Sequence, residues 1–89
     1  MFYVYLIYTI SNKKKITYVG FTNNIFKRIF LHNAGKGAKF TRGRKWKLVY
    51  YEKISSKKKA LMREYEIKNN RKLRNYLKKN FTKEIYFAK

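Results

Sequence analysis

Residues 2–22 read FYVYLIYTISNKKKITYVGFT, and this stretch decides the fold. Aromatic and β-branched residues fill segments 2–9 and 16–22, a composition that is typical of β-strands. The segment between them is polar, Ser11-Asn12-Lys13-Lys14-Lys15. The pattern predicts a β-hairpin with a longish loop over residues 11–15.

The residues after the hairpin change to helical spacing. Apolar residues four apart predict a helix over 24–33, with a buried stripe formed by Ile25, Ile29, Phe26 and Phe30. Asn23 or Asn24 suits the N-terminal cap, and Gly35 suits the stop. The chain therefore continues from the hairpin directly into a helix.

The second half of the chain predicts one more strand and two helices. A basic, glycine-bearing loop over 35–45 leads to strand character over 46–54, and Ser55 or Ser56 can cap a helix over about 57–69. Leu73, Tyr76 and Leu77 predict a third short helix, after which 81–89 adds a terminal strand or no regular structure. Because no repeat or linker interrupts the chain, residues 1–89 are predicted to form a single α+β domain. Its expected architecture is a small antiparallel sheet of about three strands flanked by helices in the order ββαβα(α).

The charge of the chain indicates a polyanionic partner. Lys and Arg number 24 against 4 acidic residues, a formal net charge of +20 over 89 residues. The hydrophobic share of 45% is too high for a disordered basic tail, so the chain should fold. It has no Cys and no apolar run near the ~20 residues that a membrane span needs. We expect a cytoplasmic monomer with no membrane association and no small-molecule cofactor.

Few residues are suited to metal or acid–base chemistry. Two-metal phosphoryl transfer needs several carboxylates close together, structural zinc needs four Cys or His ligands, and paired-imidazole ribonuclease chemistry needs two His. The chain has one histidine, His32, and no Asp; its acids are Glu52, Glu64, Glu66 and Glu84. An enzyme with this composition works with one carboxylate, one imidazole, and tyrosine, arginine and lysine.

Glu64 lies in an apolar part of the second predicted helix. With Ala60 at 0° and about 100° per residue, Ile67 falls at about 340°, Glu64 at about 40°, Leu61 at about 100° and Tyr65 at about 140°. A carboxylate among apolar residues is costly unless a metal ion or a buried arginine compensates its charge. The alternatives are an intrahelical pair with one of the neighbouring lysines, or a position facing solvent.

Arg28 and His32 lie one turn apart on the first predicted helix, beside its apolar stripe. Side chains that border a pocket between helix and sheet would lie at this position. Taken singly, Arg28 reads as a surface charge and His32 as a histidine at the rim of the core. Tyr5 and Tyr18 are two of nine tyrosines, and each by itself reads as an ordinary strand residue.

Together, these positions resemble the GIY-YIG nuclease family, in particular its small single-domain bacterial members, which are related to the excision-repair nuclease domain. The two motifs that name the family correspond here to Val4-Tyr5 and Tyr18-Val19-Gly20. Segment 24–28 ends in Arg28, which corresponds to the family's arginine. His32 follows four residues later, and segment 60–64, ALMRE, is similar to the family's metal-binding helix. One departure is Tyr3, which replaces the glycine that opens the first motif. The resemblance covers residues 3–70.

The resemblance implies a metal-dependent DNA endonuclease that acts without sequence preference or on DNA structure, in repair or in processing of branched or single-stranded DNA. Glu64 would hold one Mg²⁺ or Mn²⁺, and Arg28 would bind the scissile phosphate. Tyr5 or Tyr18 would position or deprotonate the water, and His32 would assist the exit of its proton. The residues leave open which tyrosine is the base.

The basic loop predicts nucleic-acid contacts. Phe40 and Trp46 alternate there with cations suited to phosphates, and the expected contacts are Lys36, Lys39, Arg42 and Arg44; a solvated loop is the alternative. Two other functions fit the charge. One is a DNA- or RNA-binding module with this fold and little chemistry. The other is a basic ribosome-associated protein, which leaves the set of five site residues unexplained.

Overall fold

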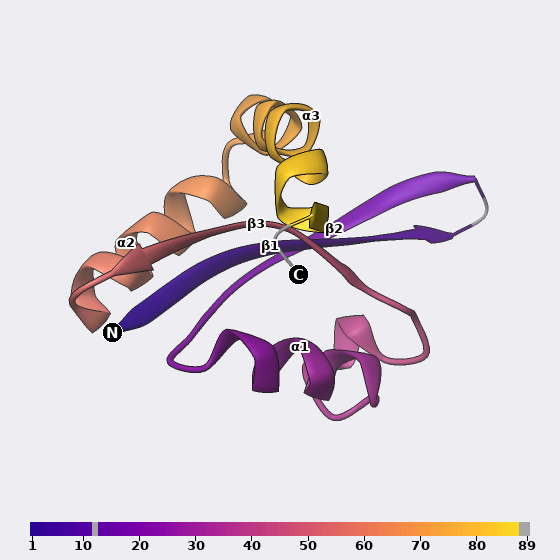
Figure 1. The fold of residues 1–89 in the computed structure, drawn as a ribbon, viewed down its shortest axis with the longest axis horizontal. Helices are drawn as coiled ribbons and strands as arrows, with labels where there is room; N and C mark the ends of the chain where they lie inside the picture. Colours follow the sequence, from indigo (N-terminus) through magenta and orange to yellow (C-terminus); the bar gives the residue numbers. More distant parts are fainter. Residues whose placement is uncertain (12, 88–89) are drawn as a thin grey trace.

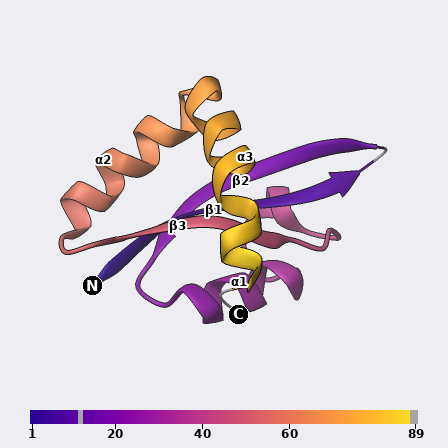
Figure 2. The same ribbon diagram turned by 45° about the horizontal axis from the view of Figure 1, so that its top comes forward.

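The computed structural model describes residues 1–11 and 13–87 and confirms the predicted α+β fold. A central strand, β1 (Phe2–Ser11), pairs antiparallel with β2 (Lys14–Thr22) on one side and with β3 (Lys47–Ile54) on the other. The helices are α1 (Ile25–Asn33), α2 (Lys57–Lys68) and α3 (Arg71–Phe87). Figure 1 shows α1 below the sheet and α2 above it, and Figure 2 shows α3 crossing the sheet on the side of α2.

The alternation along β1 divides the core between the two faces of the sheet. Val4 and Leu6 point to one face and pack with Ala60 and Ile67 of α2 and Leu77 of α3. The other face is covered by α1 and by the segment before β3; its buried core is Tyr5, Ile7, Ile25, Trp46 and Leu48. β1 is buried on both faces, and the polar hydroxyl of Tyr5 therefore lies inside the protein.

The hairpin is tighter than predicted. Pairing continues to Ser11 and Lys14, so the expected loop over residues 11–15 is wrong. Lys13 has a φ of 65°, in the left-handed region that tight turns use. The polar residues at the end of the hairpin lie beyond the core. They pair in solvent because they continue the antiparallel ladder that already joins β1 and β2 in the core.

Two local predictions at the helix ends are confirmed. The side chain of Asn24 caps α1 by accepting a hydrogen bond from Lys27 N at 3.1 Å, and Ser56 caps α2 by accepting from Lys59 N at 3.2 Å. α3 is much longer than the short helix expected, and it continues through residues 81–87, where a strand or irregular structure was predicted. Residues 88 and 89 of that prediction lie outside the described residues.

The apolar stripe predicted on α1 is wrong in part. Phe26 and Phe30 are 76% and 70% exposed, whereas the polar His32 is fully buried. On α2, Ala60 and Ile67 are buried as expected, but Leu61 and Tyr65 face outward. Among the described residues, no helix is long and apolar enough to cross a membrane.

Candidate active site

The hairpin places two tyrosines on the face of the sheet that α1 covers. Tyr5 on β1 is paired with Gly20 on β2, and Tyr18 is paired with Ile7. A Cβ atom at Gly20 would clash with Oη and Cζ of Tyr5. The glycine of the Tyr18-Val19-Gly20 motif therefore makes room for the Tyr5 ring.

α1 brings Arg28 and His32 to these tyrosines. The Tyr5 Oη atom lies 2.8 Å from Nε2 of His32, and Arg28 donates from Nε to the same oxygen at 3.4 Å. The Tyr18 ring meets the His32 ring edge-on, with 5.2 Å between centroids. Four of the five predicted site residues thus form one cluster between helix and sheet.

The loop after α1 holds His32 from its other side. The Nδ1 atom of His32 lies 2.9 Å from Oγ1 of the buried Thr41, and a Cβ atom at Gly37 would clash with the imidazole ring. Trp46 Nε1 donates to the carbonyl oxygen of Thr41 at 2.9 Å. Asn33 in turn exchanges two hydrogen bonds with the Trp46 backbone. Sequence reasoning missed Thr41 and Gly37, because no pattern in the loop distinguishes a residue under the histidine from a solvated one.

Burial changes the proton affinity of the central pair. It lowers the pKa of His32 from 6.5 to about 4, and the charge of Arg28 lowers it further. Burial raises the pKa of Tyr5 from 10.0 to about 12; the hydrogen bond and charge of Arg28 act in the opposite direction, whereas Tyr18 and Glu64 add to the increase. At neutral pH both groups are therefore uncharged, and the imidazole keeps a lone pair.

Lowering the pH from 7 to 4 is expected to destabilise the protein. Between pH 6.5 and about 4 the unfolded chain binds a proton at His32 that the folded protein does not bind. This contribution is complete above pH 6.5 and is lost as the pH falls, by about 3 kcal/mol at most, since one pKa unit is worth ~1.4 kcal/mol. Urea unfolding at pH 7, 5.5 and 4 measures it.

The variant His32→Gln is the control, because it differs from the parent only in the group that the prediction concerns. Its stability should fall less over this pH range than that of the parent. An NMR titration in which His32 of the folded protein has a pKa near 6.5 would contradict the prediction.

Glu64 approaches the cluster from α2, on the other side of the sheet. It is half-buried, and it has no hydrogen bond or ion pair with a site residue or a lysine in the described part of the chain. Its charge is the smallest of the influences that raise the pKa of Tyr5. Glu52 and Glu66, by contrast, are both paired with Arg63.

The acidic residues could hold one metal ion that takes few ligands from the protein. No group of three or more His, Cys, Asp or Glu comes together among the described residues. The Glu64 carboxylate could hold Mg²⁺, a hard cation that keeps several of its waters and takes one or two carboxylates. The donor set does not fit zinc or a two-metal centre.

The predicted cationic loop lies on the same side of the sheet as the cluster. Lys36, Lys39 and Arg42 are exposed, whereas Arg44 is half-buried with its guanidinium 5.0 Å from the centre of the Phe40 ring. Phe40 in turn stacks on Tyr18, with ring centroids 6.2 Å apart. Nη1 of Arg44 is buried without a hydrogen-bond partner among the described residues. Trp46 is buried in the core and cannot stack on a base.

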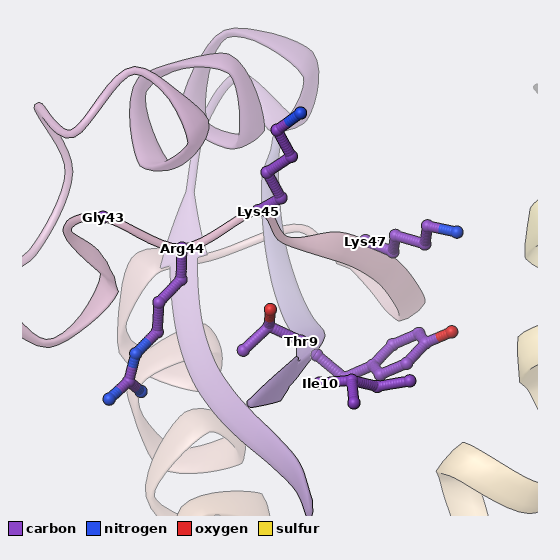
Figure 3. A pocket seen from close by; sticks show the side chains of 7 residues that line it. Thr9, Ile10, Gly43, Arg44, Lys45 and Lys47 are labelled. Carbon is purple, nitrogen blue, oxygen red and sulfur yellow. The ribbon is translucent and has the colours of Figure 1, made fainter. Parts of the chain in front are cut away.

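The loop continues into a pocket of about 400 Å³ at the far end of the hairpin. Figure 3 shows Thr9 and Ile10 of β1 on one side of it and the chain from Gly43 onward on the other. Three cations line it, Arg44, Lys45 and Lys47. The sequence pattern did not single out the last two, because neither belongs to a lysine run or a motif.

Two smaller depressions border the cluster itself. One, of about 210 Å³, is lined in part by Lys27 and Arg28. The other, of about 310 Å³, is lined by Tyr18 and Phe40 together with Lys68 and Arg74. Each brings a site residue to a concave surface that also carries a cation.

The chain is similar to known proteins over most of its length. Residues 1–80 match the GIY-YIG catalytic domain. A UPF0213 protein of Clostridium perfringens is 45% identical over 84 residues, which are 90% of each chain. One of Staphylococcus haemolyticus is 51% identical over 63 residues, 70% of this chain and 77% of that protein. The solution NMR structure of a UPF0213 protein from Bacillus halodurans is 35% identical and covers 86% of this chain and 82% of its own, with a TM-score of 0.48.

Proposed function

Since the chain belongs to the GIY-YIG catalytic domain family, we propose that it is a metal-dependent endonuclease that hydrolyses phosphodiester bonds in DNA. The observation that carries the proposal is the cluster of buried Tyr5 and His32 with half-buried Arg28 between helix and sheet, in a chain of net charge +20. A structural hydrogen-bond network does not need an arginine at a concave surface. Phosphoryl transfer uses such a cation to stabilise the charge on the phosphoryl oxygens.

Each member of the cluster has a role in that reaction. Arg28 uses Nε to hold Tyr5, which leaves its two terminal nitrogens for oxygens of the scissile phosphate. A tyrosine oxygen would accept a hydrogen bond from the attacking water, and His32 supplies a neutral acceptor for a proton. Mg²⁺ bound at Glu64 would stabilise the charge on the phosphoryl oxygens and on the leaving 3′ oxygen.

The surface around the cluster favours branched or single-stranded DNA, and we propose a role in repair or processing of such DNA. Phe26 and Phe30 on α1 and Phe40 in the loop are exposed, and the Arg44 guanidinium lies over the Phe40 ring. Exposed aromatic rings can stack on unpaired bases, which a regular duplex does not offer. We do not propose reading of base sequence, because in the part of the chain whose side chains the structure describes no helix is suited to reading a groove.

The test is incubation with labelled duplex, single-stranded, flap and four-way DNA in Mg²⁺ or Mn²⁺. We expect cleavage that requires the metal, is abolished by EDTA, and is faster on unpaired or branched DNA. Cleavage that survives EDTA would contradict the metal dependence, and equal rates on all four DNAs would contradict the structural preference.

A nucleic-acid-binding module with little chemistry is the second candidate. One observation favours it: with pKa values of about 12 for Tyr5 and about 4 for His32, neither group is a strong base in the free protein. Tight DNA or RNA binding without cleavage under either metal would select this function.

DNA binding is expected to weaken steeply with salt. Four to eight phosphate contacts imply a slope of log affinity against log salt of roughly −4 to −7 on duplex DNA. Replacing both Lys45 and Lys47 by alanine should reduce the steepness by about 1 for each of the two lysines that binds a phosphate. Fluorescence anisotropy at several salt concentrations measures the slope.

The matched control replaces Lys58 and Lys59 by alanine. This pair removes the same charge from α2, on the other side of the sheet, so its slope should stay nearer to that of the parent. Equal slopes for the two double variants would show that the pocket does not contact the DNA backbone.

A further inference from the structure

We propose that the pocket at the far end of the hairpin is a second binding site, separate from the cluster of Tyr5 and His32, and that it takes the terminal phosphate of a DNA strand. It lies between residues 8–10 of β1 and the segment that leads into β3 (Figure 3). We call it the hairpin-end pocket. The inference rests on the proposed nuclease function and names DNA with a phosphorylated end as its substrate class.

The sheet leaves room for a ligand at this end. β1 pairs with β2 as far as Ser11, but its pairing with β3 ends at Tyr8, opposite Lys47. The edge of β1 at Thr9 and Ile10 therefore has no strand beside it in the sheet that the structure describes. The pocket in this gap measures about 400 Å³, against ~30 Å³ for one water molecule, so a phosphate group with part of its sugar fits.

Thr9 presents a buried hydroxyl to this pocket. The residue is only 7% exposed, yet its hydroxyl makes no hydrogen bond within the described part of the chain. Figure 3 shows its oxygen pointing toward the segment that carries Lys45. Because buried polar groups are nearly always hydrogen-bonded, an unpaired hydroxyl that lines a pocket points to a ligand that completes it. A phosphate oxygen can accept the threonine hydrogen.

Three cations line the same space. Figure 3 shows Arg44, Lys45 and Lys47 on different sides of Thr9. In the described part of the chain none of the three has an ion pair, and no acidic residue lines the pocket. Nη1 of Arg44 is buried without a hydrogen-bond partner there. Since like charges that lie close together repel, an anion is the ligand that this pocket favours.

A terminal phosphate fits the pocket better than a phosphate within a strand. A phosphodiester carries one negative charge, whereas a phosphomonoester carries about 1.5 to 2 near pH 7 and has three free oxygens. An internal phosphate also has a sugar on each side, which keeps it away from a hydroxyl as deeply buried as that of Thr9. A terminal phosphate has a sugar on one side only and can enter the pocket end-on.

The pocket lies at a fixed distance from the proposed active site. Thr9 and Tyr5 are four residues apart on β1, so their side chains point to the same face of the sheet. Their Cα atoms are about 13 Å apart at ~3.3 Å per residue. One strand of duplex DNA has a phosphate about every 3.4 Å along the axis. A strand end held in the pocket would therefore place the active site roughly four nucleotides into the strand.

Binding of short single-stranded oligonucleotides tests the pocket without cleavage. The probes carry a 5′-phosphate, a 3′-phosphate or no phosphate, with the fluorescent label at the other end, and EDTA removes the metal. At 0.15 M salt the Debye length is about 8 Å, so distant lysines add little to the difference between probes. The parent should bind one phosphorylated probe about 10-fold more tightly than the unphosphorylated one, and inorganic phosphate should reduce this preference.

Variants of the pocket connect the preference to its residues. Thr9→Val removes the hydroxyl but keeps a β-branched side chain that suits a strand, and it should lower the preference to about threefold or less. The exposed pair Lys45→Ala and Lys47→Ala should remove the preference. The control pair Lys58→Ala and Lys59→Ala on α2 loses the same charge and should keep it.

Cleavage gives a second readout. With the preferred end phosphorylated, cuts should fall roughly four nucleotides from that end whatever the base sequence. Without the phosphate, or in the Lys45 and Lys47 double variant, the cuts should be spread along the strand.

Three results would overturn the inference. The first is equal binding of phosphorylated and unphosphorylated probes by the parent, even if inorganic phosphate alone binds. The second is a preference that survives in the Lys45 and Lys47 double variant. The third is a glutamate peptide that competes for the pocket as well as the phosphorylated probe, which would identify a site for acidic peptides. If the preference holds but the parent cleaves no DNA under any metal, the nuclease function fails and the terminal-phosphate site stands.

Discussion

Replacing Glu64 by glutamine is expected to lower the rate of DNA cleavage by at least about 100-fold in saturating Mg²⁺. Glutamine keeps the shape of the side chain but loses the charge that would hold the metal ion. DNA affinity should stay the same or improve, because a carboxylate that repels phosphate is removed. Single-turnover cleavage and anisotropy binding under the same conditions separate the two effects.

Glu66→Gln is the matched control for this prediction. Glu66 lies on the same helix and its loss changes the net charge equally, but its carboxylate is paired with Arg63 on the surface. This variant should cleave DNA within a few-fold of the parent rate. If Glu64→Gln also retained the parent rate, the metal site would not be at Glu64, and the binding-module function would gain support.

Replacing Tyr5 by phenylalanine is expected to lower kcat by about 100- to 10,000-fold, the range that general acid–base groups contribute. The substitution removes the one oxygen that joins Arg28 to His32 and leaves the ring in its buried position. KM should change less than kcat, since Arg28 keeps its terminal nitrogens for phosphate. Steady-state cleavage of a labelled DNA measures both constants.

Two tyrosine controls test whether the loss of activity is specific to the Tyr5 hydroxyl. Tyr3→Phe alters the same strand and face, where the Tyr3 ring contacts Tyr51, and should leave kcat near the parent value. Tyr18→Phe keeps the ring contacts with His32 and Phe40 and should cost much less than Tyr5→Phe. A larger loss in Tyr18→Phe than in Tyr5→Phe would identify Tyr18 as the base.

Much of the fold was readable because local signals agreed with each other. The hairpin pattern of residues 2–22, the asparagine cap of α1 and the serine cap of α2 all concern residues close in sequence. The length of α3 was underestimated, because its polar composition gives a weak apolar period. Helix formation there is supported by packing of residues such as Leu77 on the sheet, which a local pattern does not show.

The residues of the candidate site could be named from the sequence, but their arrangement in space could not be predicted from it. Tyr5, Tyr18, Arg28, His32 and Glu64 could be named because a family resemblance places them in order along the chain. Helical periodicity predicted buried phenylalanines beside a histidine at the rim, and the structure has the reverse for Phe26, Phe30 and His32. A helical wheel ranks side chains by polarity and cannot know which neighbours will satisfy a buried polar group.

The sequence by itself determined the α+β class, the hairpin, the helix caps and the positive charge, and it named five candidate site residues. Only the tertiary structure decided that His32 is buried between Tyr5 and Thr41, and that Gly20 and Gly37 make room for the rings of Tyr5 and His32. The physical reason is that periodicity and caps depend on residues within a few positions of each other. The burial of an imidazole and the hydrogen bonds of its two nitrogens depend on partners that the fold brings together from distant segments.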